Sequence, residues 1–202
     1  MLGLTGTVQT GKSELAKVFE ECGFTFYDLN DPQCDLRAKG TPRYDMFEAQ
    51  FPGALRDDGA KLPQFYDSVT REFYHPRIQE DIELLVPIVQ KLCTDAATES
   101  RRIVLSWEYL AELAKHLPLD HTLLMTINEK MWMKRLEARL KGRGMTGEVT
   151  LARVHKIIDL LYVWPYNIQQ DVEREMAGNF TTFDVSAEDW NAGLLRKLLK
   201  SL

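Results

Sequence analysis

The stretch Gly6-Thr7-Val8-Gln9-Thr10-Gly11-Lys12-Ser13 fits the pattern Gly-x-x-x-x-Gly-Lys-Ser/Thr at every constrained position. Glycines at this spacing let the backbone fold tightly, so that its N–H groups and the start of the following helix converge on a phosphate. Lys12 is then expected to reach the β- and γ-phosphates of ATP, and the Ser13 hydroxyl to bind Mg²⁺. We assign the next residue, Glu14, to the same ATP-binding set. A chance match in a glycine-containing turn is the alternative.

The residues on either side of this loop favour a phosphate site over a chance match. Residues 1–5 are a short apolar run, which is typical of a buried strand. After the loop, apolar residues follow with helical spacing from Leu15 to Cys22, and Gly23 is expected to end that helix. A strand, a glycine-containing loop and an amphipathic helix in this order form the context that a phosphate loop requires.

Further apolar segments have the length of buried strands, namely residues 24–27, 103–107, 122–127 and, more weakly, 180–184. Because segments with helical periodicity separate them, the sequence predicts an α/β protein of three layers. Helices should cover both faces of a parallel sheet of about five strands. Residues 28–35 are rich in acidic and turn-forming side chains and are expected to form a turn at a strand's carboxyl end.

The remaining segments carry helical periodicity. Residues 40–100 contain no convincing strand, and we expect helices there, with Pro76 at a helix start and Pro87 at a kink. A helix at 129–141 should end at Gly142 and Gly144. Two more helices are expected, at residues 148–163 and at 187–202.

Length and composition favour a single domain. A chain of 202 residues, 45% of them hydrophobic, is long enough to bury one complete core. We expect a P-loop kinase core, a helical substrate-binding insertion and a lid. The core would comprise residues 1–39, 101–128 and 148–202, with the insertion at about 40–100 and the lid at about 129–147.

Charge and cysteine content exclude several function classes. A net charge of −5 argues against a surface that binds nucleic acid mainly through counterion release. Cys22, Cys34 and Cys93 are widely spaced and odd in number, which suggests neither a disulfide framework nor a zinc site. The sequence has no signal-peptide pattern and no apolar run of about 20 residues, so we expect a cytoplasmic protein without a membrane span.

Beyond the loop, the sequence resembles the dephospho-coenzyme A kinases. Residues 2–6 together with Gly11-Lys12-Ser13 are similar to that family's start, and Gly23, a short strand and Asp28 follow as its next landmark. Tyr74-His75-Pro76-Arg77-Ile78 is similar to its His-Pro element, and Arg135-Leu136 with Arg139 to its lid helix. These landmarks occur in order over about three quarters of the chain. The resemblance implies a kinase that uses ATP to phosphorylate the ribose 3′-hydroxyl of dephospho-CoA.

The chain also departs from that family's pattern. Asn30 stands where the family carries a second acid, taken as the base that activates the acceptor hydroxyl, and an amide cannot remove a proton. The family's Pro-Leu-Leu element is replaced by Ser106-Trp107-Glu108-Tyr109. The family also has a glycine in the loop just before the last conserved residues, whereas this chain has Gln9 and Thr10 in that stretch. The family's terminal Ala-Asp…Asn element is not recognisable at residues 177–184.

Asp28 and Asp31 are the candidates for the general base. Asp28 is the first choice because it lies at the strand end nearest the loop, and Asp31 is the alternative. Asp residues at this density are also ordinary turn formers.

Arg135 and Arg139 are the candidates for the lid. With Trp132 they fall at positions i, i+3 and i+7, so they share one helix face. Arginine forks suit phosphate geometry and can stabilise charge on the transferring phosphoryl group, which makes Arg139 a catalytic candidate and both arginines ATP ligands. A solvated basic face is the alternative.

His75, Arg71 and Arg77 are the candidates for binding the acceptor. The histidine ring could donate to the acceptor, and the arginines could hold its phosphates. A histidine that holds a helix start and arginines on a surface are the alternatives.

Together these features predict transfer of the ATP γ-phosphate to a hydroxyl of a small, nucleotide-like molecule, with Mg²⁺ as cofactor and with neither nucleic acid nor membrane as a partner. A nucleoside or nucleoside-monophosphate kinase would use the same loop and lid with another acceptor pocket. The third hypothesis is a catalytically degenerate nucleotide-binding module, which Asn30 motivates. The sequence does not specify the oligomeric state.

Overall fold

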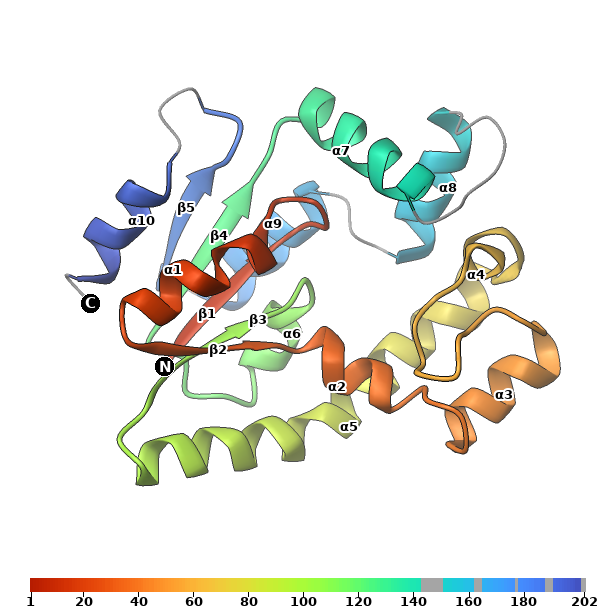
Figure 1. Cartoon of the computed structure of the whole chain (residues 1–202), viewed down its shortest axis with the longest axis horizontal. Helices are drawn as coiled ribbons and strands as arrows, with labels where there is room; N and C mark the ends of the chain where they lie inside the picture. The colour runs from red at the N-terminus through yellow and green to blue at the C-terminus, as the bar shows by residue number, and fades with distance from the viewer. Residues whose placement is uncertain (143–150, 162–164, 177, 188–190, 201–202) are drawn as a thin grey trace. The chain divides into compact units, whose positions relative to one another are not determined.

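The computed structural model of the chain describes residues 1–142, 151–161, 165–176, 178–187 and 191–200 (Figure 1). The chain divides into two compact units. Unit 1 comprises Met1–Leu29, Val86–Trp132 and Val163–Leu202, and unit 2 comprises Asn30–Leu85 and Met133–Tyr162. Gly144 and the other predicted lid residues beyond Gly142 lie outside the described residues.

Unit 1 contains a parallel sheet of five strands in the order β2-β3-β1-β4-β5. The strands are β1 (Leu2–Gly6), β2 (Phe24–Asp28), β3 (Arg102–Ser106), β4 (His121–Thr126) and β5 (Phe180–Asp184). All the predicted strands are confirmed, with ends displaced by at most one residue. The signal was reliable because the central strands are buried on both faces and therefore read as continuous apolar runs.

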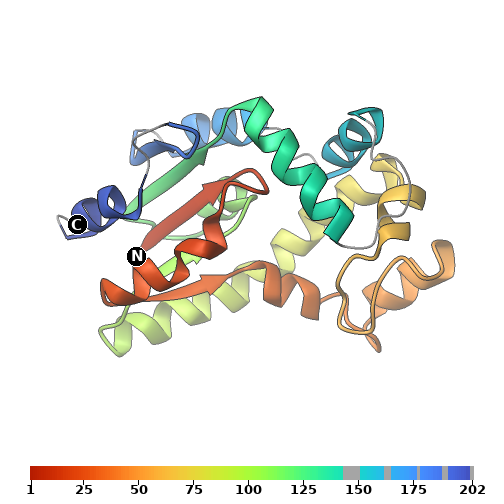
Figure 2. The same ribbon diagram turned by 45° about the horizontal axis from the view of Figure 1, so that its top comes forward.

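Helices cover both faces of this sheet, as predicted for a three-layer α/β fold (Figures 1 and 2). Helix α1 (Ala16–Glu21) packs on β2 and against α10 (Ala192–Leu199). On the other face α6 (Leu110–Ala114) and α9 (Pro165–Glu175) contact β1 and each other. Neither α6 nor α9 was predicted.

Helix α10 begins later than the predicted start at residue 187. Asn191 is its N-cap, and the side-chain oxygen of Asn191 accepts a 2.9 Å hydrogen bond from the N–H of Gly193. An asparagine at this position satisfies a backbone donor that the first helical turn leaves unpaired, so the helix starts immediately after it.

The turn predicted for residues 28–35 is wrong, because most of that segment is helix α2 (Asn30–Asp35). Pro32 falls in its first turn, where the missing N–H has no intrahelical partner in any case. An acidic residue there, Asp31, is also favoured by the positive end of the helix dipole. The same residue types therefore suit a helix start as well as a turn.

Unit 2 is helical and includes α2, α3 (Pro42–Gln50), α4 (Pro63–Ser68) and α8 (Leu151–Leu161), with parts of α5 (Arg71–Thr98) and α7 (Glu129–Gly142). The prediction that Pro76 begins a helix is wrong, since α5 starts at Arg71 and continues through both Pro76 and Pro87. The hydroxyl of Thr70 accepts a 3.3 Å hydrogen bond from the N–H of Phe73 and so caps the helix one turn earlier.

Aromatic rings form the centre of unit 2. Phe47 lies 5.7 Å from Phe65 and 5.2 Å from Phe73, and Phe65 lies 5.1 Å from Tyr74, measured between ring centroids. Phe65 and Tyr74 are fully buried, so these rings pack a core of their own within unit 2. Among the described residues, no helix is both long and apolar enough to cross a bilayer.

Candidate active site

The predicted phosphate loop leaves the carboxyl end of β1 and leads into a 3₁₀ turn, η1 (Lys12–Leu15), which continues as α1 (Figure 1). Its backbone requires unusual conformations: φ is 140° at Gly6, 68° at Gln9 and 89° at Gly11. Gln9 adopts this left-handed conformation although it has a side chain, at a cost of about 1 kcal/mol. Gln9 belongs to the stretch Gln9-Thr10, where the sequence departs from a glycine.

Gly6 also tolerates no side chain for a second reason. A Cβ atom at this residue would lie 2.3 Å from the carbonyl oxygen of Met125 on the neighbouring strand β4. The glycine therefore lets the loop leave the sheet close against β4, which is the tight path that the motif's first glycine predicts.

Lys12 lies across the loop. Its Nζ donates to the carbonyl oxygens of Gly6 at 2.7 Å and Thr7 at 3.0 Å, and the residue is only 8% exposed. Thr10 closes the loop further, because its hydroxyl donates to the Thr7 carbonyl at 2.9 Å. The ammonium group is thus held at the loop's own backbone, where it can bind phosphate oxygens.

Ser13 and Asp28 lie together beside the loop. The Ser13 hydroxyl donates a 3.0 Å hydrogen bond to Oδ2 of Asp28, the last residue of β2. A hydroxyl and a carboxylate are the oxygen ligands that Mg²⁺ prefers, so these residues fit the predicted cation. Glu14 is exposed at the same turn, and its N–H donates to the Gly11 carbonyl at 3.1 Å.

Trp132 supports the loop from the first turn of α7. Its indole Nε1 donates a 2.9 Å hydrogen bond to the carbonyl oxygen of Val8, and the side chain is fully buried. The helical spacing predicts that Trp132 shares a helix face with the lid arginines, but it does not predict a contact with the loop. Only the tertiary structure reveals that contact.

The remaining site candidates belong to unit 2. Asp31 is exposed on α2, three positions beyond Asp28 in the chain. On α7, Arg135 is half-buried and Arg139 is exposed. Arg71 is exposed as the first residue of α5.

His75 and Arg77 both have structural contacts. Nε2 of His75 lies 3.3 Å from the carbonyl oxygen of Asp159 on α8, and burial, together with the positive charge of Arg71, lowers the pKa of the His75 ring below its usual value. The guanidinium of Arg77 lies over the ring of Phe73, 4.8 Å from its centroid. The structural alternative for His75 gains support, although its contact is with α8 and it does not begin α5.

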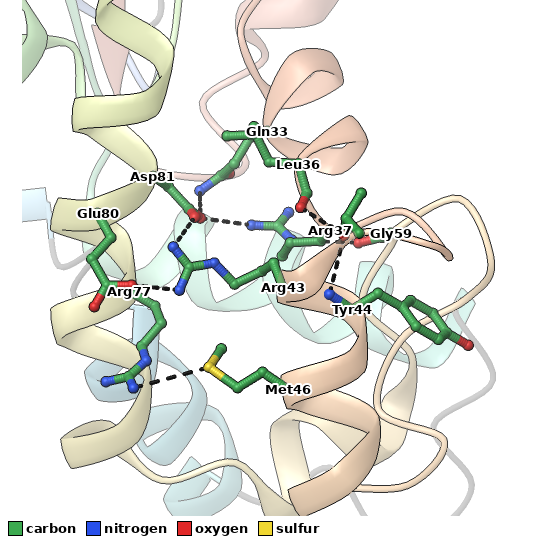
Figure 3. A network of polar contacts seen from close by, with 11 residues as sticks. Gln33, Leu36, Arg37, Arg43, Tyr44, Met46, Gly59, Arg77, Glu80 and Asp81 are labelled. Atoms are coloured by element: carbon green, nitrogen blue, oxygen red, sulfur yellow. Dashed lines mark hydrogen bonds and ion pairs between the residues drawn. The ribbon is translucent and has the colours of Figure 1, made fainter.

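A buried polar network in unit 2 was not predicted (Figure 3). Its centre is Asp81 on α5, which is 1% exposed. Oδ2 of Asp81 accepts from Nε2 of Gln33 at 3.2 Å and from Nη1 of Arg37 at 3.3 Å. Arg43 approaches Oδ1 of Asp81 at 3.2 Å as an ion pair without the directed geometry of a hydrogen bond, and it also pairs with Glu80.

This network joins α2, α3 and α5 through one carboxylate. Burial raises the pKa of Asp81, while the positive charges of Arg37 and Arg43 oppose that shift. Because Arg37 is itself 2% exposed, loss of the carboxylate would leave its charge buried without compensation. Asp81 therefore holds together the helices of unit 2 that carry Asp31 and Arg71.

Several curated dephospho-CoA kinases are similar to this chain. The one from Moorella thermoacetica is 30% identical over 155 residues, a match covering 70% of this chain and 69% of the relative. The one from Halalkalibacterium halodurans is 26% identical over 150 residues, covering 69% of this chain and 72% of the relative. No model of a protein family matches the chain.

Solved structures share the fold. TT1252 from Thermus thermophilus superposes with a TM-score of 0.60 at 19% identity, covering 100% of this chain and 96% of that one. Dephospho-CoA kinase from Campylobacter jejuni superposes with a TM-score of 0.52 at 11% identity, covering 99% of this chain and 93% of that one. At these identities the likeness concerns the fold.

Proposed function

Because the chain belongs to the dephospho-CoA kinase family, we propose that it transfers the γ-phosphoryl group of ATP to the ribose 3′-hydroxyl of dephospho-CoA. The observation that carries the proposal is the loop from β1 to η1, in which Lys12 is held at the loop backbone and Ser13 meets Asp28. Such a loop binds and positions phosphates, and positioning with charge stabilisation accounts for most of the catalysis of phosphoryl transfer.

In this proposal Lys12 exchanges its bonds to the Gly6 and Thr7 carbonyls for bonds to the β- and γ-phosphate oxygens of ATP. The position of Lys12 Nζ at the loop's own backbone supports this role. The backbone N–H groups of the loop bind the same phosphates, and the start of the following helix adds its dipole.

Ser13 and Asp28 would hold Mg²⁺. The bound ion supplies electrostatic stabilisation of the phosphate charge. The hydrogen bond between the two side chains supports a shared task, because it keeps the hydroxyl and the carboxylate at one point beside the loop. We therefore assign Asp28 to binding Mg²⁺ and not to activating the acceptor hydroxyl.

This assignment favours Asp31 as the base for the acceptor hydroxyl. Asn30 has no proton-accepting group for this purpose, and Asp28 is engaged with Ser13. Asp31 is an exposed carboxylate on α2, a helix that Gln33 anchors to the buried Asp81.

Arginines of unit 2 would bind the remaining negative charge, on the phosphates of ATP and of the acceptor. Arg135 and Arg139 on α7 are assigned to the phosphates of ATP, with Arg139 stabilising the transferring group. Arg71, exposed at the start of α5, is the favoured ligand for an acceptor phosphate. His75 and Arg77 keep a place in the acceptor set, but their contacts with Asp159 and Phe73 support a positioning role.

A substrate panel tests the proposal. The purified chain is incubated with Mg²⁺, labelled ATP and one acceptor at a time: dephospho-CoA, a nucleoside or a nucleoside monophosphate. We expect the label on dephospho-CoA at its 3′-hydroxyl and much slower transfer to the other acceptors. Preferred transfer to a nucleoside or a nucleoside monophosphate would replace the proposed acceptor. ATP binding without transfer to any acceptor would support the degenerate nucleotide-binding module.

A further inference from the structure

The side chain of Ser106 is buried on β3, next to β1, the strand that leads into the phosphate loop. Within the described part of the chain its hydroxyl has no hydrogen-bond partner. The residue is 1% exposed. It is the last residue of β3, the strand between β2 and β1. Burying a hydroxyl without a partner is unfavourable, so a native structure that does so calls for an explanation.

The register of the sheet places Ser106 next to Asp28. In the parallel pairing of β2 with β3, Asp28 is the partner of Ser106, and in the pairing of β1 with β3 the partner is Leu4. Paired residues of neighbouring strands project from the same face and lie about 4.8 Å apart. The Ser106 side chain therefore projects beside Asp28, on the strand that separates Asp28 from the phosphate loop.

The next residue, Trp107, does not share the position of Ser106 beside Asp28. Its indole Nε1 is also buried without a partner among the described residues. Side chains alternate along a strand, so Trp107 is expected to project from the opposite face, and its ring lies edge-on against Tyr109 with centroids 5.2 Å apart. Of these two residues, Ser106 is therefore the one that projects on the side of Asp28.

P-loop phosphotransferases hold Mg²⁺ with the serine or threonine of the loop and an aspartate at a strand end. Here the aspartate that meets Ser13 comes from β2, and the intervening strand ends in a hydroxyl. Mg²⁺ usually keeps several of its waters, which need hydrogen-bond acceptors close to the ion. We infer that Ser106 is a further residue of the magnesium site, whose hydroxyl accepts a hydrogen bond from a water on the ion.

This inference rests on the proposed function, since it assumes that Ser13 and Asp28 hold Mg²⁺ with a bound nucleotide. A purely structural role of the Ser106 hydroxyl would lead to a different result. Its removal would change the stability of the chain and leave the metal dependence of nucleotide binding as it is.

The experiment measures ADP binding to the full chain by calorimetry, once with Mg²⁺ and once with EDTA. We expect Mg²⁺ to lower the Kd of the wild type for ADP. The ratio of the Kd in EDTA to the Kd in Mg²⁺ should be about tenfold smaller in Ser106→Ala, as for other groups that orient metal-bound water. Binding in EDTA should be unchanged. Ser106→Cys, which keeps the size of the side chain but hydrogen-bonds weakly, should behave like Ser106→Ala.

Thr122→Val is the matched control. Thr122 is also 1% exposed, but it pairs with Gly3 near the amino end of the sheet, away from the loop. Its replacement removes a buried hydroxyl and should leave the Mg²⁺ effect at the wild-type value. Ser13→Ala serves as the reference for a lost metal ligand.

The outcomes separate this inference from the proposed function. If Ser13→Ala loses the Mg²⁺ effect while both Ser106 variants retain it in full, the role of Ser106 is overturned and the proposed function stands. If the wild type binds ADP with no Mg²⁺ effect at all, the proposed magnesium site is overturned together with the inference.

Discussion

The indole Nε1 of Trp132 donates a 2.9 Å hydrogen bond to the carbonyl oxygen of Val8, which ties the first turn of α7 to the phosphate loop. Trp132 is 0% exposed, so no water can easily replace the indole as a donor to this carbonyl. The loop conformation therefore depends on a residue 124 positions further along the chain.

Trp132→Phe should lower ATP affinity several-fold and the free energy of unfolding by about 1–2 kcal/mol, because a buried carbonyl loses its donor. Calorimetric ATP titration and urea unfolding measure the two effects. Trp107→Phe is the matched control, since Trp107 is equally buried but its Nε1 has no partner among the described residues. Equal losses of ATP affinity in both variants would rule out the hydrogen bond as the cause.

Asp28→Asn and Asp31→Asn should separate the two acidic roles. We expect Asp28→Asn to weaken Mg·ATP binding as well as turnover, because its carboxylate partners Ser13. Asp31→Asn should keep ATP affinity and reduce kcat by about 10²-fold or more, the usual effect of removing a general base. Nucleotide titration and steady-state kinetics of both variants provide the measurement. Full turnover in Asp31→Asn would exclude Asp31 as the general base and leave Asp28 as the candidate.

Asp81→Asn should destabilise the chain by about 3 kcal/mol, because it leaves the buried guanidinium of Arg37 and that of Arg43 facing a neutral amide. Glu80→Gln, one position earlier, removes a carboxylate that is 47% exposed and should cost less than about 1 kcal/mol. Urea unfolding of both variants makes the comparison. Similar losses would mean that the buried network contributes no more than a surface ion pair.

His75 should make stability depend on pH in a defined direction. Burial and the charge of Arg71 lower the pKa of His75 in the folded chain, so between that lowered value and the ordinary value of about 6.5 the unfolded chain binds more protons. Stability should therefore fall as the pH drops below about 6.5. Urea unfolding at pH 7.5 and 5.5 measures the loss, which should be smaller in His75→Gln. An unchanged loss in the variant would exclude His75 as its source.

The sequence predicted the parts of the fold whose signals are local. Residues 103–107 and 122–127 read as strands because each is buried on both faces, and the spacing of Gly6, Gly11 and Lys12 specifies the phosphate loop within a single segment. The same local order of strand, loop and helix predicted Asp28 at a strand end. These features need no knowledge of distant contacts.

The features that the sequence missed depend on partners far apart in the chain. The bond from Trp132 to Val8 and the ion pair of Arg37 with Asp81 join residues that no spacing rule relates. The start of α5 was misplaced for a local reason, because Pro76 is a strong helix-start signal and the hydroxyl of Thr70 is a weaker one. The burial of the Ser106 hydroxyl is likewise a result of tertiary packing that no local pattern predicts.

The most direct test of the central claim, that the loop from Gly6 to Ser13 binds ATP for phosphoryl transfer, is one kinetic comparison. ATP-dependent formation of CoA from dephospho-CoA is measured for the wild type and for Lys12→Ala. The account predicts product with the wild type and a fall in kcat/KM of about 10²–10³-fold in the variant, the range found when one charge-stabilising group is removed. No product with the wild type, or an undiminished rate in Lys12→Ala, would contradict it.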